Sequence, residues 1–230
     1  MDSIAAMEKR YSVRNFSRED FDASFREKVR CWVDALEPLL DFPLLSWQVQ
    51  EDPGACGQLF SPVPQGDSDA LIQYGFQGEQ LVLQLVEAGW GTLWQAIGSG
   101  RGIPARIRFG REKGTLHWKN LLSRKGKRKP LSELIGEGQQ FLNPGLEQVL
   151  EACQGAPSAL NRQPWVFRLR DPNGFEIGLS QKWALQQLDL GIVLCHGYLA
   201  AKQLFSKVSL EKVQNGHFLV CWEKKKEEKK

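Results

Sequence analysis

Apolar residues recur at helical spacing along much of this chain. Residues 2–9 predict a short amphipathic helix with Asp2 as its cap. Residues 22–40 predict a longer helix, capped by Asp22 or Ser24, in which apolar side chains fall near i, i+4, i+7, i+8 and i+11. Each of these helices therefore has one apolar face to bury.

Two further segments, residues 76–88 and residues 191–205, are apolar on nearly every face, as is typical of helices in the middle of a structure. Each follows a helix, a proline and a tryptophan in the same order. The corresponding landmarks are spaced 114, 118 and 116 residues apart: Pro43 and Pro157, Trp47 and Trp165, Gly75 and Gly191. This spacing predicts an internal duplication whose two apolar helices pack at a pseudo-twofold interface. The alternative is two α+β subdomains that resemble each other by chance.

The segments between these helices predict strands and loops. Residues 45–49 (LSWQV) and 165–167 (WVF) predict strands. Residues 51–69 predict a loop, because they are rich in glycine, proline and serine turn signals. Residues 89–110 predict a glycine-punctuated loop that leads into a strand.

Two prolines mark further helices. Pro130 is expected to open a short one, and Asn143, followed by a proline at the first helical position, caps another. Together the elements predict an α+β fold with antiparallel-rich sheets flanked by helices. We expect a first half over residues 1–135, a second half over residues 136–222 and a disordered charged tail over residues 223–230.

Composition and charge narrow the class of protein. The 230 residues are 42% hydrophobic, which is ordinary for one large or two small globular domains. The net charge of +3 is not gathered into a basic stripe, so no nucleic-acid partner is expected. The N-terminus does not resemble a signal peptide, and no span of about 18 apolar residues occurs. A soluble, cytoplasmic protein without a membrane partner is expected.

Cysteine and histidine give no sign of a metal site. The five cysteines are irregularly spaced without a CxxC pair, and the three histidines are scattered, so reduced thiols and no bound metal are expected. No GxSxG elbow supports a nucleophile triad. Within the apolar helix, His196 is interpreted as a core histidine with satisfied hydrogen bonds, and Trp165 as a core residue.

Three segments hold polar groups in restricted backbone. Arginine and serine at alternate positions of residues 10–14 project to one side if the segment is extended, where they could hold a phosphate. Residues 89–92 and 98–100 are glycine-rich and could expose backbone N–H groups to a ligand. Residues 157–161 form a stiff polar loop before a strand. Taken singly, each is as well explained by a solvated surface or a helix end.

In this order, these segments resemble the FMN-dependent nitroreductase family. RYSVRNF at residues 10–16 is similar to that family's RxSxRxF opening, and residues 75–94 are similar to its central helix running into GLGTxW. Residues 128–131 (RKPL) resemble its closing RxPL. Residues 156–167 match APSxxNxQPWxF almost position for position. The resemblance covers most of residues 8–205.

The resemblance also implies how the chain is assembled. In that family the usual protein is a homodimer with two flavin sites at its interface, where one subunit supplies the PSxxN loop and the other supplies the remaining segments. Here the full PSxxN loop occurs only in the second half, and the first half has FPLLSW in its place. The chain therefore resembles the pseudo-dimeric TM nitroreductase branch, with one FMN per chain and a monomeric state.

The first-half residues receive roles from the resemblance. Arg10, Ser12 and Arg128 would hold the ribityl phosphate, a dianion that suits guanidinium forks and a hydroxyl. Arg14 would lie near the pyrimidine edge, where positive charge raises the reduction potential of the flavin. Tyr11 lies between these residues and is counted with them.

The remaining contacts would come from backbone and from the second half. A backbone N–H of Gly98 or Ser99 would meet flavin N5. The PSxxN loop would bracket the ring through Pro157, Ser158, Ala159 and Asn161. No side chain is then needed as nucleophile, because the flavin carries the chemistry.

The resemblance implies an FMN-dependent oxidoreductase. Hydride would pass from NAD(P)H through the flavin to a small electrophilic acceptor such as a nitroaromatic or a quinone. The alternative is a non-catalytic flavin-binding or scaffold protein that retains the fold.

Overall fold

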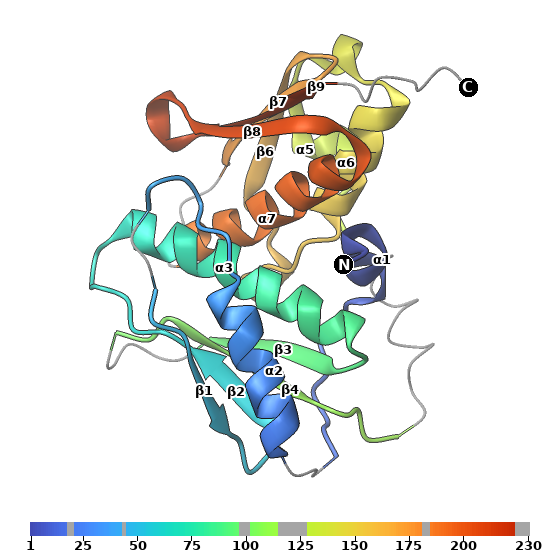
Figure 1. Cartoon of the computed structure of the whole chain (residues 1–230). Helices are drawn as coiled ribbons and strands as arrows, with labels where there is room; N and C mark the ends of the chain where they lie inside the picture. The colour runs from blue at the N-terminus through green and yellow to red at the C-terminus, as the bar shows by residue number, and fades with distance from the viewer. Residues whose placement is uncertain (18–20, 43–44, 97–101, 115–127, 181–184, 224–230) are drawn as a thin grey trace.

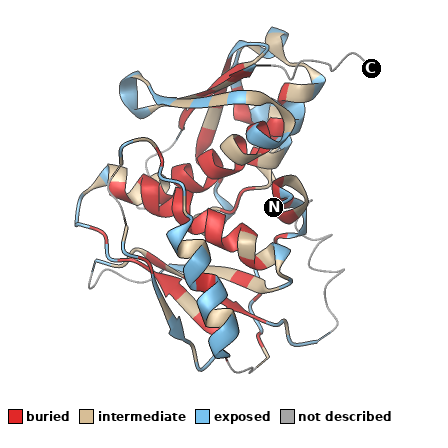
Figure 2. Cartoon of the chain, in the orientation of Figure 1, coloured by how far each residue is buried: buried red, intermediate tan, exposed pale blue. Residues whose placement is uncertain are grey.

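Two long helices cross between two sheets in the computed structural model of this chain (Figure 1). The structure describes residues 1–17, 21–42, 45–96, 102–114, 128–180 and 185–223. The crossing helices are α3 (Ser68–Glu87) and α7 (Gln186–Leu204), and nearly all of their residues except those near the ends are buried (Figure 2). Their central position confirms what the two all-apolar segments predicted.

The other helices are shorter. They are α1 (Ser3–Lys9), α2 (Ala23–Asp34), α5 (Leu131–Leu134), α6 (Pro144–Gln154) and the 3-10 turns η1 (Gln139–Phe141), η2 (Ala159–Asn161) and η3 (Gln214–Gly216). The predicted caps are confirmed, since Asp2 accepts from the Ala5 amide, and Asp22 rather than Ser24 caps α2. Both long helices begin before the glycines at which the apolar segments were expected to open.

The first sheet is fully antiparallel. Its strands are β1 (Gln48–Glu51), β2 (Gly57–Phe60), β3 (Gly91–Ala96) and β4 (Ala105–Gly110), in the order β1-β2-β4-β3. The expectation of a loop over residues 51–69 was wrong where β2 lies, and the expectation that residues 89–110 begin with a glycine-punctuated loop was wrong where β3 lies. Turn-forming residues flank both strands and conceal them in the sequence, and both strands pair with β4 in the sheet.

The second sheet repeats this order. Its strands are β5 (Ile135–Glu137), β6 (Trp165–Asp171), β7 (Gly174–Leu179), β8 (Ser206–Lys212) and β9 (Phe218–Glu223), in the order β5-β6-β7-β9-β8. Without β5, the order β6-β7-β9-β8 matches β1-β2-β4-β3, and each set is interrupted by its long helix after the second strand. The division at residue 135 stays a prediction; β5 begins there and pairs in parallel with β6.

A pair of glycines allows α3 and α7 to approach closely. A Cβ added to Gly75 would overlap the Leu188 carbonyl oxygen and lie 2.9 Å from the Ile192 amide nitrogen. A Cβ added to Gly191 would meet the backbone of α3 in the same way, at Ile72 and Phe76. Each of these contacts on one helix therefore has its counterpart on the other helix, 116 positions away in the sequence.

Candidate functional site

A buried arginine, Arg10, lies where α1 ends. Its side chain is 3% exposed, and its Nε lies 4.0 Å from the Glu79 carboxylate of α3, which is fully buried. Among the described residues, this Nε has no hydrogen-bond partner. Burial lowers the pKa of Arg10, and the Glu79 charge opposes that shift. The interior thus holds a cation whose pairing is incomplete.

Glu79 is shared among several donors. Its carboxylate accepts from Trp94 Nε1 at 2.7 Å and lies 2.9 Å from His196 Nε2. The other His196 nitrogen, Nδ1, lies 2.8 Å from the Ala152 carbonyl oxygen, so it must donate there. The interpretation of His196 as a satisfied core histidine is therefore confirmed. Since the two closer donors occupy Glu79, the contact to Arg10 is the longest of the three.

Arg128 connects the first part of the chain to the PSxxN loop. Its guanidinium donates to the carbonyl oxygens of Gly155 at 3.0 Å and Ala156 at 2.7 Å, and to Asn161 Oδ1 at 2.9 Å. Burial, together with the nearby charge of Arg10, lowers the pKa of Arg128 to about 10, although the Glu79 charge opposes the shift. Arg128 is still charged at neutral pH. The structure thus brings Arg10, Arg128 and Asn161 into one region, although they are far apart in sequence.

The PSxxN loop is held in an uncommon backbone conformation. Leu160, Asn161 and Gln163 have positive φ values of 53°, 56° and 47°. A bulky residue such as leucine rarely adopts this region, which is found where surrounding contacts enforce it. Here the Gln163 amide donates to Ser158 Oγ at 2.9 Å, and the Ala159 amide donates to a carboxylate of α7 at 2.9 Å. The loop is therefore preorganised by more than its prolines.

The residues after Arg10 do not alternate as predicted. Arg10 and Val13 are buried, whereas Ser12 and Arg14 are exposed. The expectation that residues 10, 12 and 14 project to one side was wrong, because the Val13 amide donates to the Thr92 carbonyl and anchors the segment along the edge of β3. This edge pairing, which the sequence pattern does not reveal, sets which side chains turn inward.

The other predicted contacts are distributed as follows. Tyr11 is partly buried and donates its hydroxyl to Glu112. Pro157 is buried, and Ser158 and Ala159 are partly exposed beside it. Gly98 and Ser99 lie outside the described residues.

A cavity of about 1080 Å³ lies beside these groups. Arg128 and Gly155 line it, and Tyr11, Trp90 and Thr92 form other parts of its wall. Thr92 Oγ1 is buried without a hydrogen-bond partner among the described residues. The cavity therefore combines a cationic group, aromatic rings and a free hydroxyl.

Sequence reasoning missed Glu79 and Asp189 as members of this region. Glu79 lies in the apolar segment 76–88, and Asp189 lies in the first turn of α7. Both are almost completely buried. An acidic residue inside an otherwise apolar helix is the signal that could have identified them, because buried carboxylates need partners. Trp165, by contrast, is a core residue as predicted.

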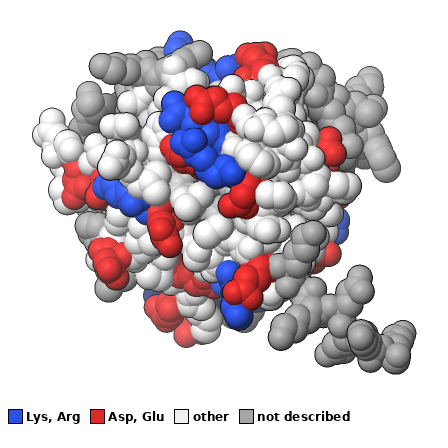
Figure 3. Space-filling view, turned by 90° about the horizontal axis from the view of Figure 1, so that it is seen from above, with Lys and Arg blue, Asp and Glu red and all other residues white. Residues whose placement is uncertain are grey.

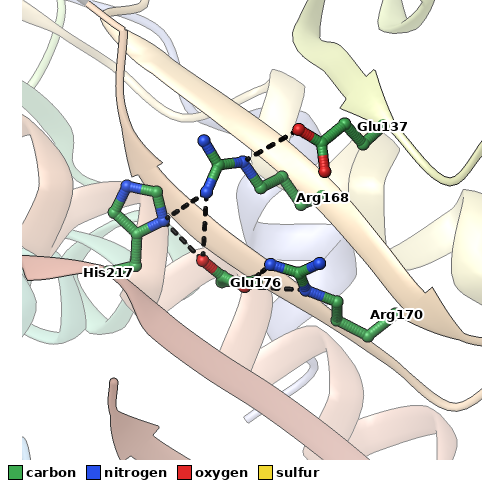
Figure 4. Close-up of polar contacts among 5 residues, drawn as sticks. All are labelled: Glu137, Arg168, Arg170, Glu176 and His217. Carbon is green, nitrogen blue, oxygen red and sulfur yellow. Dashed lines mark hydrogen bonds and ion pairs between the residues drawn. The ribbon is translucent and has the colours of Figure 1, made fainter. Parts of the chain in front are cut away.

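A second polar cluster lies on the five-stranded sheet (Figure 4). Glu176 of β7 accepts from Arg170 Nε at 2.8 Å and lies 2.6 Å from His217 Nδ1, while Arg168 bridges it to Glu137. Burial raises the pKa of Glu176, but its bonds to Arg170 and His217 outweigh burial and lower it overall. Since each charge has a partner within the cluster, its role is to join neighbouring strands.

The charges on the surface are mixed. In the view from above, basic side chains lie beside acidic ones (Figure 3). Among the described residues, none of the helices has the length and apolarity that crossing a bilayer requires. The same part of the chain contains no group of three or more His, Cys, Asp or Glu side chains placed to hold a metal ion. All five cysteines are free thiols.

The burial of Asp189 should make the free energy of unfolding depend on pH. Burial raises the pKa of Asp189 from 3.8 to about 7, although the Ala159 amide opposes the shift. The folded state therefore holds this proton more tightly than the unfolded chain, so stability is lost as pH rises from about 4 to about 7. Asp189→Asn removes the titration, and its free energy of unfolding should exceed that of the wild type by on the order of 3 kcal/mol above pH 7.

Urea unfolding at about pH 5 and about pH 8 measures this difference. The other charged side chains of α3 and α7 are bound elsewhere: Asp69 to Lys212, Glu79 to His196, Glu87 to the Asp2 amide, and Lys202 to Glu37. An advantage of Asp189→Asn that stays constant between the two pH values contradicts the prediction.

Comparison with known proteins identifies the family. The family model described as "Putative TM nitroreductase" matches residues 2–201. The chain belongs to this nitroreductase family. A nitroreductase of Thermotoga maritima MSB8, known from its crystal structure, is 28% identical with a TM-score of 0.78, over 96% of this chain and 94% of that chain. The predicted nitroreductase family and α+β fold class are thereby confirmed.

More distant nitroreductases share less of the chain. A nitroreductase family protein of Clostridium novyi NT is 16% identical with a TM-score of 0.40, over 49% of this chain and 86% of that one. An FMN-dependent nitroreductase of Clostridium difficile R20291 is 12% identical with a TM-score of 0.42, over 49% and 88%. No curated protein matches the chain.

Proposed function

We propose that this nitroreductase family member is an FMN-dependent oxidoreductase that transfers hydride from NAD(P)H, through the flavin, to a small electrophilic acceptor such as a nitroaromatic or a quinone. The observation that carries the proposal is the incomplete pairing of Arg10. Arg10 is buried and Arg128 lies partly buried near it, and among the described residues the Glu79 carboxylate is the one acidic group whose charge acts on both guanidiniums. A phosphate is the kind of group that would balance them.

The residues present fit this cofactor. Arg10 offers an unused, buried N–H, and guanidinium forks bind phosphate oxygens in pairs. The PSxxN loop lies against Arg128, so Asn161 and the phosphate-binding side belong to one region. Ser12 and Arg14 are exposed, so they would contact the side of the ligand that faces solvent. The cavity of about 1080 Å³ is slightly larger than the range of about 300–1,000 Å³ that is typical of ligand pockets.

The protein's contribution would be to bind and orient. When bound, FMN supplies the hydride acceptor and donor that amino-acid side chains lack. Arg10 and Arg128 would hold the phosphate end, and the rigid loop at Pro157 would fix one side of the ring. Arg14, as a cation near the pyrimidine edge, would favour the reduced form, so its loss should impair reduction more than binding.

We further propose that the chain is a fused pseudo-dimer with one cofactor site. The repeated strand order and the reciprocal glycine contacts of α3 and α7 support this proposal. The first-half segment that corresponds to the PSxxN loop has no asparagine, which argues for a single site. Such a chain would bind flavin as a monomer.

The visible spectrum of the purified protein tests the function. We expect a yellow protein, or one that takes up added FMN to about one per chain, because there is one complete set of residues. NADH or NADPH under nitrogen should bleach the flavin, and a nitroaromatic or a quinone should restore the colour. A protein that takes up no FMN contradicts the enzyme. A yellow protein that neither nicotinamide bleaches supports a flavin-binding role without turnover.

A further inference from the structure

The carboxyl group of Asp189 connects α7 to the PSxxN loop. Its Oδ1 accepts the Ala159 amide at 2.9 Å, and the residue is 1% exposed. Its Oδ2 is buried without a hydrogen-bond partner among the described residues. We propose that Asp189 is a positioning residue, which fixes the conformation of the loop from Pro157 to Asn161 through the Ala159 amide. The expected effect on FMN affinity rests on the proposed function, whereas the expected effect on the conformation of the loop does not.

The backbone of the loop shows why an anchor is needed. Leu160 and Asn161, the two residues after Ala159, both have left-handed φ values. Leu160 is also 79% exposed, so packing of its own side chain does not hold it in place. A left-handed conformation of non-glycine residues persists only where other contacts enforce it. Two hydrogen bonds hold the loop on either side of Leu160. One joins Asp189 to the Ala159 amide, and the other joins Arg128 to Asn161 Oδ1.

The other half of the chain contains a counterpart. Gln73 precedes Asp189 by 116 positions, the spacing that also separates Gly75 from Gly191. Gln73 is fully buried, and its Oε1 accepts the Leu39 amide at 2.8 Å, just as Asp189 accepts from its own loop. Its Nε2, like the second oxygen of Asp189, is buried without a partner among the described residues.

The two anchors differ in charge. The first half uses a neutral amide, and the half with the PSxxN loop uses a carboxylic acid. A carboxylate accepts a stronger hydrogen bond than an amide oxygen does, and its burial is unfavourable.

Substitution at the two anchors separates positioning from stability. Asp189→Leu removes the acceptor, Asp189→Asn keeps it, and Gln73→Leu is the matched control in the other half. The measurements are amide hydrogen exchange of residues 156–164, FMN affinity from quenching of FMN fluorescence, and urea unfolding. Ala159→Pro is a second variant that removes the donor while residue 189 stays; Ser158, with φ −146° and ψ 158°, has backbone angles compatible with a following proline.

We expect Asp189→Leu and Ala159→Pro to lose protection in the loop and to bind FMN at least about tenfold more weakly. Asp189→Asn should retain both properties. Gln73→Leu should lower stability without changing FMN affinity. Unchanged exchange of the loop in Asp189→Leu overturns the proposal, and so does equal loss of FMN affinity in Gln73→Leu. Wild-type protein that binds no FMN contradicts the proposed function, while the exchange data still decide whether Asp189 anchors the loop.

Discussion

Gly191→Ala is expected to destabilise the protein by about 3 kcal/mol or more, because the added Cβ has no space between α3 and α7. It would overlap the Ile72 carbonyl oxygen and lie 2.8 Å from the Phe76 amide nitrogen. Both are backbone atoms, so relief requires the two helices to move apart. That movement would loosen the most buried part of the molecule. Gly75→Ala should have a similar effect, since it meets the backbone of α7 reciprocally.

Gly197→Ala is the matched control on the same helix. Its Cβ would meet Phe175 Cζ at 2.9 Å and Cys153 Sγ at 3.0 Å, which are side-chain atoms that can shift. The gain in helix propensity, about 1 kcal/mol, offsets part of that strain. Urea unfolding followed by circular dichroism compares the three variants. Equal stability of Gly191→Ala and Gly197→Ala contradicts the close crossing.

Arg10→Met is expected to weaken FMN binding about 10- to 100-fold. A hydrogen bond to a charged group contributes about 1.5–3 kcal/mol, and each 1.4 kcal/mol is a factor of ten in affinity. Methionine keeps an apolar stem of similar length, so the loss reports the guanidinium rather than packing. Asn161→Ala should act in the same direction. Fluorescence quenching of added FMN measures each affinity.

Two further variants control for indirect effects. Arg10→Met leaves Glu79 without its cationic neighbour, so the double variant Arg10→Met/Glu79→Gln should regain stability and still bind FMN weakly. Arg30→Met removes an exposed arginine of α2, which is paired with Glu27, and should bind FMN as the wild type does. Wild-type affinity in Arg10→Met would falsify the phosphate site.

The local signals in the sequence were reliable where a side chain acts on its own backbone. The cap of α6 by Asn143 is an example, because its side chain accepts the amides of Gly145 and Leu146 within three residues. The strands β2 and β3 were missed for the opposite reason. Turn-forming residues flank these short segments, and their pairing with β4 becomes visible only in the folded sheet.

The candidate site also has features that local sequence signals predicted and features that depend on long-range contacts. The motif at residues 156–167 located the loop and predicted its family, because proline and polar residues before a buried strand form a distinctive pattern. The inward turn of Arg10 and the outward turn of Ser12 could not be read from alternation. They follow from the pairing of Val13 with Thr92, a contact between residues 79 positions apart in the chain.

The sequence by itself determined the elements whose causes are local: the caps, the two apolar helices, the repeated landmarks and the flavin-family motifs. The tertiary structure decided which polar groups become buried and which of them meet. Arg10 of the N-terminal segment meets Glu79 of α3, and Asp189 of α7 meets the Ala159 amide of the PSxxN loop, in a fold centred on the crossing of α3 and α7 at Gly75 and Gly191. Burial and pairing depend on residues distant in the chain, and short-range patterns carry no information about those distances.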